Sequence, residues 1–445
     1  MLAARRGQRL VDVKHHLVVK LRRAIPEPPW IPDWVTFITN KSTEITTVDA
    51  EVDAVLHEAD RAFWVTHEYA PAGEGWAPLE VEHGLNRTYR LVMQADEARL
   101  PDDLVMRLAA LQSVESVRQL EIGGATLPDH ETKAVPQSFD SGRRDVIGLG
   151  FAHALSRGRP DILVAVLDTG VNLDHPELRG KIVGKADFVD LEGLDTSSFV
   201  GDYLGVDDDP EDELGHGTHV AGIIAAEGVA MDPGIVPECR LLAVRVLATL
   251  KDGDRLQGAG IVDNINNGIK WAVDQRADVI NMSLGIRHTG GGLPHEDVIR
   301  YALGHGVTVV AASGNDGTDT KYYPGALPGV VAVGAVDDGG NVAPFTSYGA
   351  QISVVAPGVN ILSSFAHGKY AVASGTSQAS PCVAGAIALL ASLARDHGAR
   401  LGADDVAAIL RQTSDRPDRR LRTIHAGYGE INLTDAVKYL LASLN

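Results

Sequence analysis

Long, nearly uninterrupted apolar segments in the later part of the chain constrain its fold most strongly. They lie at Asp161–Asp168, Arg240–Leu247, Ala277–Leu284 and Val307–Ser313. Such runs are typical of strands that are covered on both faces of a parallel sheet. Helical patterns separate some of them, at Ile261–Gln275 and Glu296–Leu303. This alternation predicts an α/β fold with a doubly wound, mostly parallel sheet flanked by helices.

The first 130 residues have a different pattern, in which short strand-like and helix-like segments alternate. The strand-like segments are His16–Leu21, Thr88–Gln94 and Val114–Ile122, and the helix-like segments are Thr47–Phe63 and Pro101–Ser113. They predict a small α+β module over residues 1–130. Residues 131–144 are polar and rich in turn formers, which indicates a linker to a large domain at 145–445.

The composition excludes several functions. With 40 basic and 59 acidic residues the net charge is −19, so we expect no non-specific binding to nucleic acid. No run of about 18 apolar residues is present, so we expect no membrane span. The N-terminus lacks the apolar core of a signal peptide, which favours the cytoplasm and leaves export open. Cys239 and Cys382 have no metal-binding spacing and predict no disulfide framework.

Three polar residues that suit nucleophilic catalysis each lie in a turn bracketed by glycine. Asp168 lies in LDTGV, His216 in GHGTHVAG and Ser377 in SGTSQASP. A serine hydroxyl is a weak nucleophile unless a base removes its proton during attack. We therefore expect Ser377 to be the nucleophile and His216 to be the base and then the acid. Asp168 would orient the imidazole and stabilise its protonated form.

The expected sheet brings these residues to one edge. Asp168 ends one predicted strand, Asn315 follows another, and active sites of open parallel sheets lie beyond the carboxyl ends of the strands. His216 and Ser377 each begin an apolar helix, whose first N–H groups are unpaired and carry partial positive charge. The Asn315 side chain and the Ser377 backbone N–H are the expected donors to a tetrahedral oxyanion.

From about Asp145 to the C-terminus the chain resembles the subtilisin-like serine proteases, or subtilases. The motifs that carry the resemblance are VAVLDTGV, GHGTHVAG, VINMSLG, AASGNDG and SGTSQASPCVAGAIALL. The chain order Asp, His, Ser is that of the subtilisin triad. The resemblance implies a serine endopeptidase that acts on polypeptides and needs no cofactor for catalysis. Gln378 and Cys382 replace the methionine and histidine usual in the family, and neither change removes a catalytic group.

The resemblance also implies how substrate binds. An extended peptide would pair with two segments, Ser283, Leu284 and Gly285 on one side and Gly258, Ala259 and Gly260 on the other. Strand addition of this kind uses exposed edges, and small residues allow close approach. The pocket for the side chain before the cut would be lined by Ala312, Ser313 and Gly314. Asp316 would favour a basic side chain there and Tyr322 would narrow the pocket; otherwise both simply face solvent.

An acidic stretch precedes the catalytic histidine. Within it Asp207, Asp209 and Glu211 are placed as in a calcium-binding loop of thermitase-like subtilases. Calcium prefers several oxygen ligands from flexible loops. These three residues are therefore candidate ligands of a structural calcium ion, and the alternative is a solvated acidic loop.

The resemblance gives the N-terminal region the position of a propeptide. The strand that ends in Val117–Gly124 would then approach the cleft, with Leu127–Lys133 as the candidate for self-cleavage. The chain would be a self-processing zymogen with its own N-terminal region in its cleft. The alternatives are a permanent accessory domain and, for the whole chain, a catalytically silent peptide-binding protein on the same fold, against which the intact triad argues.

Overall fold

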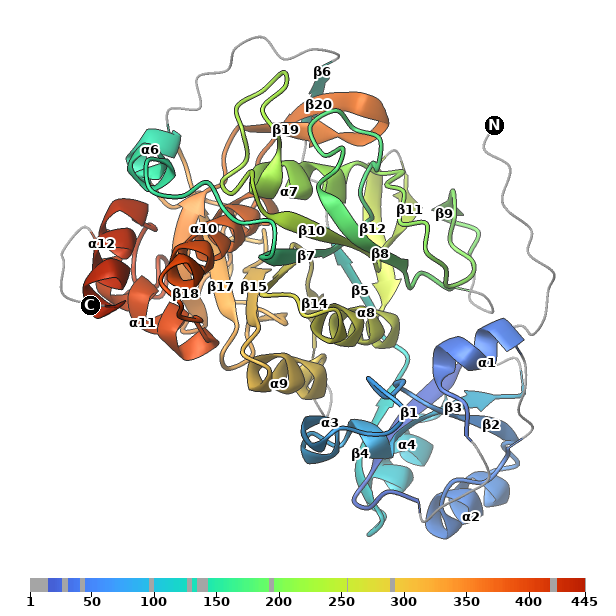
Figure 1. The fold of residues 1–445 in the computed structure, drawn as a ribbon. Coiled ribbons are helices and arrows are strands. Elements are labelled where there is room, and N and C mark those ends of the chain that lie inside the picture. Colours follow the sequence, from blue (N-terminus) through green and yellow to red (C-terminus); the bar gives the residue numbers. More distant parts are fainter. Residues whose placement is uncertain are drawn as a thin grey trace.

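A seven-stranded sheet forms the centre of the main domain (Figure 1). The computed structural model describes residues 15–25, 31–40, 45–95, 100–125, 130–133, 143–191, 196–253, 255–288, 293–416 and 422–444. The strand order is β18–β17–β15–β13–β7–β10–β8, and every neighbouring pair is parallel. The strands are β7 Leu163–Asp168, β8 Ile182–Asp187, β10 Arg240–Arg245, β13 Val279–Met282, β15 Thr308–Ala312, β17 Val331–Val336 and β18 Ile352–Pro357. This arrangement confirms the predicted fold class.

The alternation of side chains along each strand builds two apolar layers. In β7, Val164 and Val166 pack into the layer that contains α7 (His216–Ala225) and α10 (Thr376–Asp396). Ala165 and Leu167 pack into the opposite layer with α8 (Val262–Asp274) and α9 (Glu296–Gly304). Both faces of the sheet are thus buried, which explains why its strands are apolar without polar interruption.

Helix α10 crosses the centre of the first layer and is almost completely enclosed (Figure 1). By length and composition it would be able to cross a membrane, but 94% of its apolar 18-residue window is buried inside the protein. Burial on all sides accounts for its apolar composition. Three further helices pack against this layer: α6 Leu149–His153, α11 Ala403–Thr413 and α12 Leu433–Leu444.

The N-terminal module is an antiparallel sheet with helices on one face. The strand order is β2–β3–β1–β4, with bounds β1 His16–Leu21, β2 Phe63–His67, β3 Thr88–Met93 and β4 Val114–Gln119. Its helices are α1 Trp34–Asn40, α2 Ala50–Glu58, α3 Pro78–Glu82 and α4 Asp102–Ala109. The helix predicted at Thr47–Phe63 is shorter at both ends. Asp49 caps its start, and Asp60 has a positive φ of 55° where the chain turns into β2.

Two short strands near the end of the N-terminal region pair with the main domain. The strand predicted at Val114–Ile122 divides into β4 and β5 (Ile122–Ala125), and β5 joins β12 (Arg255–Ile261). Inside the predicted linker, β6 (His130–Lys133) joins β20, and residues 134–142 lie outside the described part. The remaining elements are β9 Phe199–Val200, β11 Ala248–Asp252, β14 Ile286–Arg287, β16 Tyr322–Tyr323, β19 Ile361–Phe365, β20 Lys369–Ala373 and α5 Arg143–Val146.

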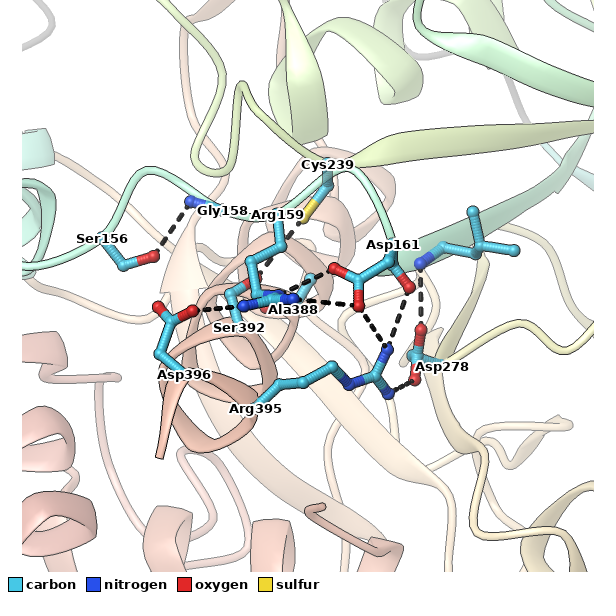
Figure 2. A network of polar contacts seen from close by, with 11 residues as sticks. Ser156, Gly158, Arg159, Asp161, Cys239, Asp278, Ala388, Ser392, Arg395 and Asp396 are labelled. Atoms are coloured by element: carbon cyan, nitrogen blue, oxygen red, sulfur yellow. Dashed lines mark hydrogen bonds and ion pairs between the residues drawn. The ribbon is translucent and has the colours of Figure 1, made fainter. Parts of the chain in front are cut away.

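A polar network fastens the far end of α10 to the amino-terminal edge of the sheet (Figure 2). Arg395 of α10 donates to the Asp161 carbonyl oxygen at 2.9 Å and to Asp278 Oδ1 at 2.6 Å. The other carboxylate oxygen of Asp278 accepts from the Leu163 backbone N–H at 3.0 Å, at the start of β7. The network therefore joins α10 to the first residues of β7 and β13, at the edge opposite the candidate catalytic residues.

Replacing Arg395 should destabilise the fold without changing catalysis. We expect Arg395→Met to lower the free energy of unfolding by about 1–3 kcal/mol, because the largely buried Asp278 carboxylate loses a charged partner. Arg400→Met is the matched control: Arg400 is 79% exposed and lies 3.9 Å from the same carboxylate, so its loss should cost little. Denaturant unfolding measures both. Equal effects of the two substitutions would contradict this role of Arg395.

Candidate active site

The carboxyl end of β7 holds the predicted aspartate against the predicted histidine. The distance from His216 Nδ1 to Asp168 Oδ1 is 2.6 Å, and both side chains are buried. The same Asp168 oxygen accepts the Thr169 backbone N–H at 2.8 Å. Contact with a carboxylate makes Nδ1 the protonated nitrogen, which leaves Nε2 as the free base.

The two glycines around His216 allow α7 to begin at the end of β7. Gly215 has a φ of 99°, a conformation that favours glycine. A Cβ at position 217 would collide with the carbonyl oxygen of Gly170 and come within 3.0 Å of Asp168 Cβ. Without that Cβ the helix approaches closely enough for His216 to reach Asp168.

A second buried carboxylate, Asp212, fixes the first turn of α7. Its Oδ1 accepts from the Thr169 hydroxyl at 2.9 Å and from the backbone N–H of Leu214 and Gly215. Its Oδ2 accepts both the N–H and the hydroxyl of Thr218, at 2.8 and 2.6 Å. Burial raises the pKa of Asp212, and the hydrogen bonds from Thr218 oppose this rise. The sequence prediction missed Asp212 because it lies among the other carboxylates of the acidic stretch.

Ser377 lies in the first turn of α10, where a proline changes the hydrogen bonding. Pro381 has no N–H, so the usual helical donor to the Ser377 carbonyl oxygen is missing. The Ser283 hydroxyl donates to that oxygen instead, at 2.9 Å. Ser283 Oγ in turn accepts from the Asn281 side chain at 3.1 Å, and Asn281 Oδ1 accepts from Ser380 at 2.7 Å. The end of β13 therefore positions the nucleophile.

The Ser377 hydroxyl itself points to the Ser283 carbonyl oxygen, at 3.2 Å. His216 Nε2 makes no hydrogen bond to the residues that the structure describes. Proton transfer from serine to histidine therefore requires the hydroxyl to turn from Ser283 toward His216. Such loose geometry is common in sites without a reacting substrate.

Asn315 is oriented by the residue before the nucleophile. Its Oδ1 accepts both the backbone N–H and the hydroxyl of Thr376, each at 2.9 Å. Two donors on one side fix which amide atom faces Thr376, so Nδ2 remains available as a donor. This orientation fits the predicted role of Asn315 toward an oxyanion.

Strand β5 lies between the two segments predicted to bind substrate. Gly123, Gly124 and Ala125 pair antiparallel with the strand that contains Gly258, Ala259 and Gly260. On the other side Gly124 exchanges two hydrogen bonds with Gly285, at 2.9 and 3.3 Å. Both segments thus accept an extended chain by strand addition, and the occupant is the chain itself.

The structure also bears on the pocket that was predicted from Ala312, Ser313 and Gly314 at the end of β15. The neighbouring carboxylate of Asp316 is paired with Arg287 and accepts the Tyr322 hydroxyl at 2.8 Å. These contacts weaken the expectation that Asp316 attracts a basic substrate side chain. The ring of Tyr322 lies against Gly314, where an added Cβ would meet it within 2.6 Å, which fits the narrowing expected of Tyr322.

The three candidate calcium ligands have other partners. Glu211 accepts from Asn172 Nδ2 at 2.5 Å and from the Leu173 backbone N–H at 3.1 Å. Asp207 Oδ1 accepts the Asp209 backbone N–H at 2.7 Å. Across the described ranges, no group of three or more His, Cys, Asp or Glu side chains is arranged to hold a metal ion. These contacts do not fit a site built on the three carboxylates.

Comparison with known proteins identifies related chains. The sequence profile described as "Subtilase family" matches residues 159–429. The "Thermophilic serine proteinase" of Bacillus sp. (strain AK1) is 41% identical over 295 residues, which are 65% of this chain and 65% of that protein. "Thermitase" of Thermoactinomyces vulgaris is 37% identical, over 62% of this chain and 88% of that protein. This chain therefore spans less than two thirds of the first relative's length.

A solved structure is similar as well. The prenylagaramide maturation protease PagA matches with a TM-score of 0.54 at 32% identity, over 66% of this chain and 98% of that one. All four residues predicted to carry the chemistry lie inside the part that the family profile matches: Asp168, His216, Asn315 and Ser377.

The pH dependence of activity should report the His216–Asp168 contact. Burial lowers the pKa of His216, but the charge and hydrogen bond of Asp168 raise it further, and the net shift is upward from 6.5. The base must be neutral, so kcat/KM should fall as the pH drops through a midpoint above 6.5. In Asp168→Asn the midpoint should move down and kcat should fall by about 10⁴, as in the corresponding trypsin variant. An unchanged midpoint in Asp168→Asn would contradict the assignment.

Loss of the Asn315 side chain should lower the rate of the chemical step. We expect Asn315→Ala to reduce kcat about 100- to 1,000-fold with little change in KM, the range given for the oxyanion asparagine of subtilisin. Thr376→Val keeps the Asn315 amide and removes one of its two orienting donors, so its loss should be smaller. Steady-state kinetics on one peptide substrate compares the two. A KM effect alone in Asn315→Ala would indicate ground-state binding instead.

Proposed function

Because the chain belongs to the subtilase family, we propose that it is a serine endopeptidase that hydrolyses peptide bonds through an acyl-enzyme on Ser377. The observation that carries the proposal is the 2.6 Å contact between His216 and Asp168 at the sheet edge where α10 presents the serine. A peptide-binding protein without catalysis would not need a buried carboxylate against a buried imidazole, since burial of such groups is costly.

The proposed reaction uses side chains and water. Ser377 Oγ attacks the substrate carbonyl carbon while its proton moves to His216 Nε2, and the carbonyl π electrons move to the oxygen. Asn315 Nδ2 and the Ser377 backbone N–H donate to the resulting oxyanion. Collapse of the tetrahedral intermediate breaks the C–N bond, and His216 protonates the leaving amine. A water molecule then attacks the acyl-enzyme, with His216 again as the base.

We further propose that the N-terminal module is a propeptide whose end lies in the cleft as a substrate would. A buried ionic interface supports this pairing of module and main domain. Asp263 of α8 lies 2.9 Å from His16 Nε2 and 3.1 Å from Arg118 Nη2, both in the module sheet. Burial alone would raise the pKa of Asp263, but Arg118 and His16 lower it well below its usual range.

A second buried pair belongs to the same interface. Arg90 and Glu68 are fully buried, with the guanidinium donating to both carboxylate oxygens at 2.7 and 2.8 Å. Asn264 and Asn267 of α8 extend the pair, through Arg90 at 3.1 Å and Glu68 at 3.1 Å. Buried charges of this kind are tolerated only with such complete partners, so the interface is specific rather than incidental.

The pairing of β5 suggests which bond is cut. Gly124 is paired with Gly285, and the same antiparallel register counted forward assigns position 126 to Ser283. The Ser283 carbonyl oxygen lies 3.2 Å from Ser377 Oγ. Residues 126–129 are outside the described part, so the assignment rests on the register. We expect cleavage of the bond between Thr126 and Leu127, at the start of the segment predicted from the sequence.

Calcium has no part in this proposal. Binding by Asp207, Asp209 and Glu211 stays a sequence-based prediction, since Glu211 already serves two donors in the loop that follows Asp168.

Self-processing can be tested on two matched full-length chains. The wild-type protein should convert to fragments whose masses correspond to residues 1–126 and 127–445, and Ser377→Ala should stay whole under identical conditions. Intact mass spectrometry over time distinguishes them. Fragments in both chains would indicate a contaminating protease, and a stable wild-type chain would favour a permanent accessory domain. A cut elsewhere would show that the register of β5 does not define the bond.

A further inference from the structure

The chain crosses the candidate active site between two sheet edges, and the second edge has no role in the function proposed so far. Strand β5 enters on the side of Gly258–Gly260, and β6 leaves along β20. Four residues, 126–129, separate β5 from β6. Figure 1 shows β5 below the catalytic layer and β6 beside β20 at the opposite end of the cleft.

The register of β6 begins at the catalytic helix and runs away from it. His130 pairs with Ala373, three residues before the first residue of α10, and Lys133 pairs with Tyr370. Because the pairing is antiparallel, the chain moves away from Ser377 as it passes along β20. A polypeptide that lay in the cleft in the direction of β5 would leave it along the same edge.

The edge of β20 is held rigid by the helix that carries the catalytic histidine. His219 Nε2 contacts the carbonyl oxygens of Ile361 and Ala371, each at 3.1 Å, and so links α7 to both strands of the β19–β20 hairpin. The hydroxyls of Ser363 and Ser364 donate to the carbonyl oxygens of His219 and Thr218, at 2.7 and 2.9 Å. A fixed edge lowers the entropic cost of adding a strand.

We infer that β20 is a binding edge for the part of a polypeptide substrate that follows the cut bond, at about its fourth to seventh residue. The inference rests on the proposed function, and β6 is the edge's occupant within this chain. Recognition would run through backbone hydrogen bonds, so it would select extended, unfolded segments of about twelve residues rather than a particular sequence. After self-cleavage β6 would stay attached to the main domain and compete with substrate for the edge.

The competition determines how the test is designed. The double substitution Glu131→Pro with Thr132→Pro removes two consecutive N–H groups from β6. Adjacent residues of a strand point their N–H groups to opposite sides, so one of the two faces β20. The self-processed double variant should therefore have an open β20 edge. A chain with residues 130–133 replaced by Gly-Ser-Gly-Ser is the matched control, because it keeps every N–H.

Four peptides with the sequence of residues 122–129 compare tails of different kinds: none, His-Glu-Thr-Lys, Gly-Ser-Gly-Ser and His-Pro-Pro-Lys. In the double variant, the native tail should raise kcat/KM about tenfold or more over the peptide without a tail. Most of the gain should remain with Gly-Ser-Gly-Ser and disappear with His-Pro-Pro-Lys. The self-processed wild-type enzyme should show a smaller gain. Equal cleavage of the short and long peptides by the double variant would overturn the inference, as would a full gain from the proline tail.

Amide hydrogen exchange provides a readout that does not need catalysis. In full-length Ser377→Ala, the proline pair should unprotect amides of Tyr370–Ala373 and leave Gly258–Ile261 protected. Unchanged protection of Tyr370–Ala373 would overturn the inference. If no peptide is cleaved by any active form, the proposed function fails, and the exchange experiment still decides whether β20 binds a strand.

Discussion

The first turn of α7 lies so close to the end of β7 that only glycine fits at position 217. The rest of the site depends on this approach. It brings His216 within 2.6 Å of Asp168, and it places Thr169 where its hydroxyl accepts the Gly217 N–H at 3.0 Å. Asp212 then ties the same turn together from behind. The imidazole is therefore oriented before any substrate arrives, which lowers the cost of orienting it during the reaction.

The nucleophile is positioned by an exchange of hydrogen-bond partners. Pro381 leaves the Ser377 carbonyl oxygen without its helical donor, and the Ser283 hydroxyl takes the place of that donor. Ser283 also ends the segment to which a substrate would bind, and Gly285 two residues later pairs with Gly124. The strand that binds the chain and the turn that presents the serine are thus one connected unit. Movement of either would shift the distance between the reacting atoms.

Much of the architecture follows from local sequence because each of those features has a local cause. The strands β7, β10, β13 and β15 are apolar throughout, and His216 and Ser377 lie at glycine-marked helix starts. Contacts between distant residues have no such mark. The pairing of Asp212 with Thr169, the replacement of a helical donor by Ser283, and the burial of Arg90 against Glu68 all join separate segments. The pairing of β6 with β20 was hidden for a further reason: the segment has a linker's composition, and only backbone groups form the pairing.

The central claim is that Ser377 is a nucleophile activated by His216, and covalent labelling tests it most directly. A fluorophosphonate probe reacts with an activated serine hydroxyl, so peptide mapping should find the label on Ser377 once residues 1–126 have left the cleft. Ser377→Ala and His216→Ala should remain unlabelled under the same conditions. A wild-type chain that stays unlabelled after its N-terminal region has been removed by an added protease would contradict the account. It would leave a silent peptide-binding protein as the better description of the fold.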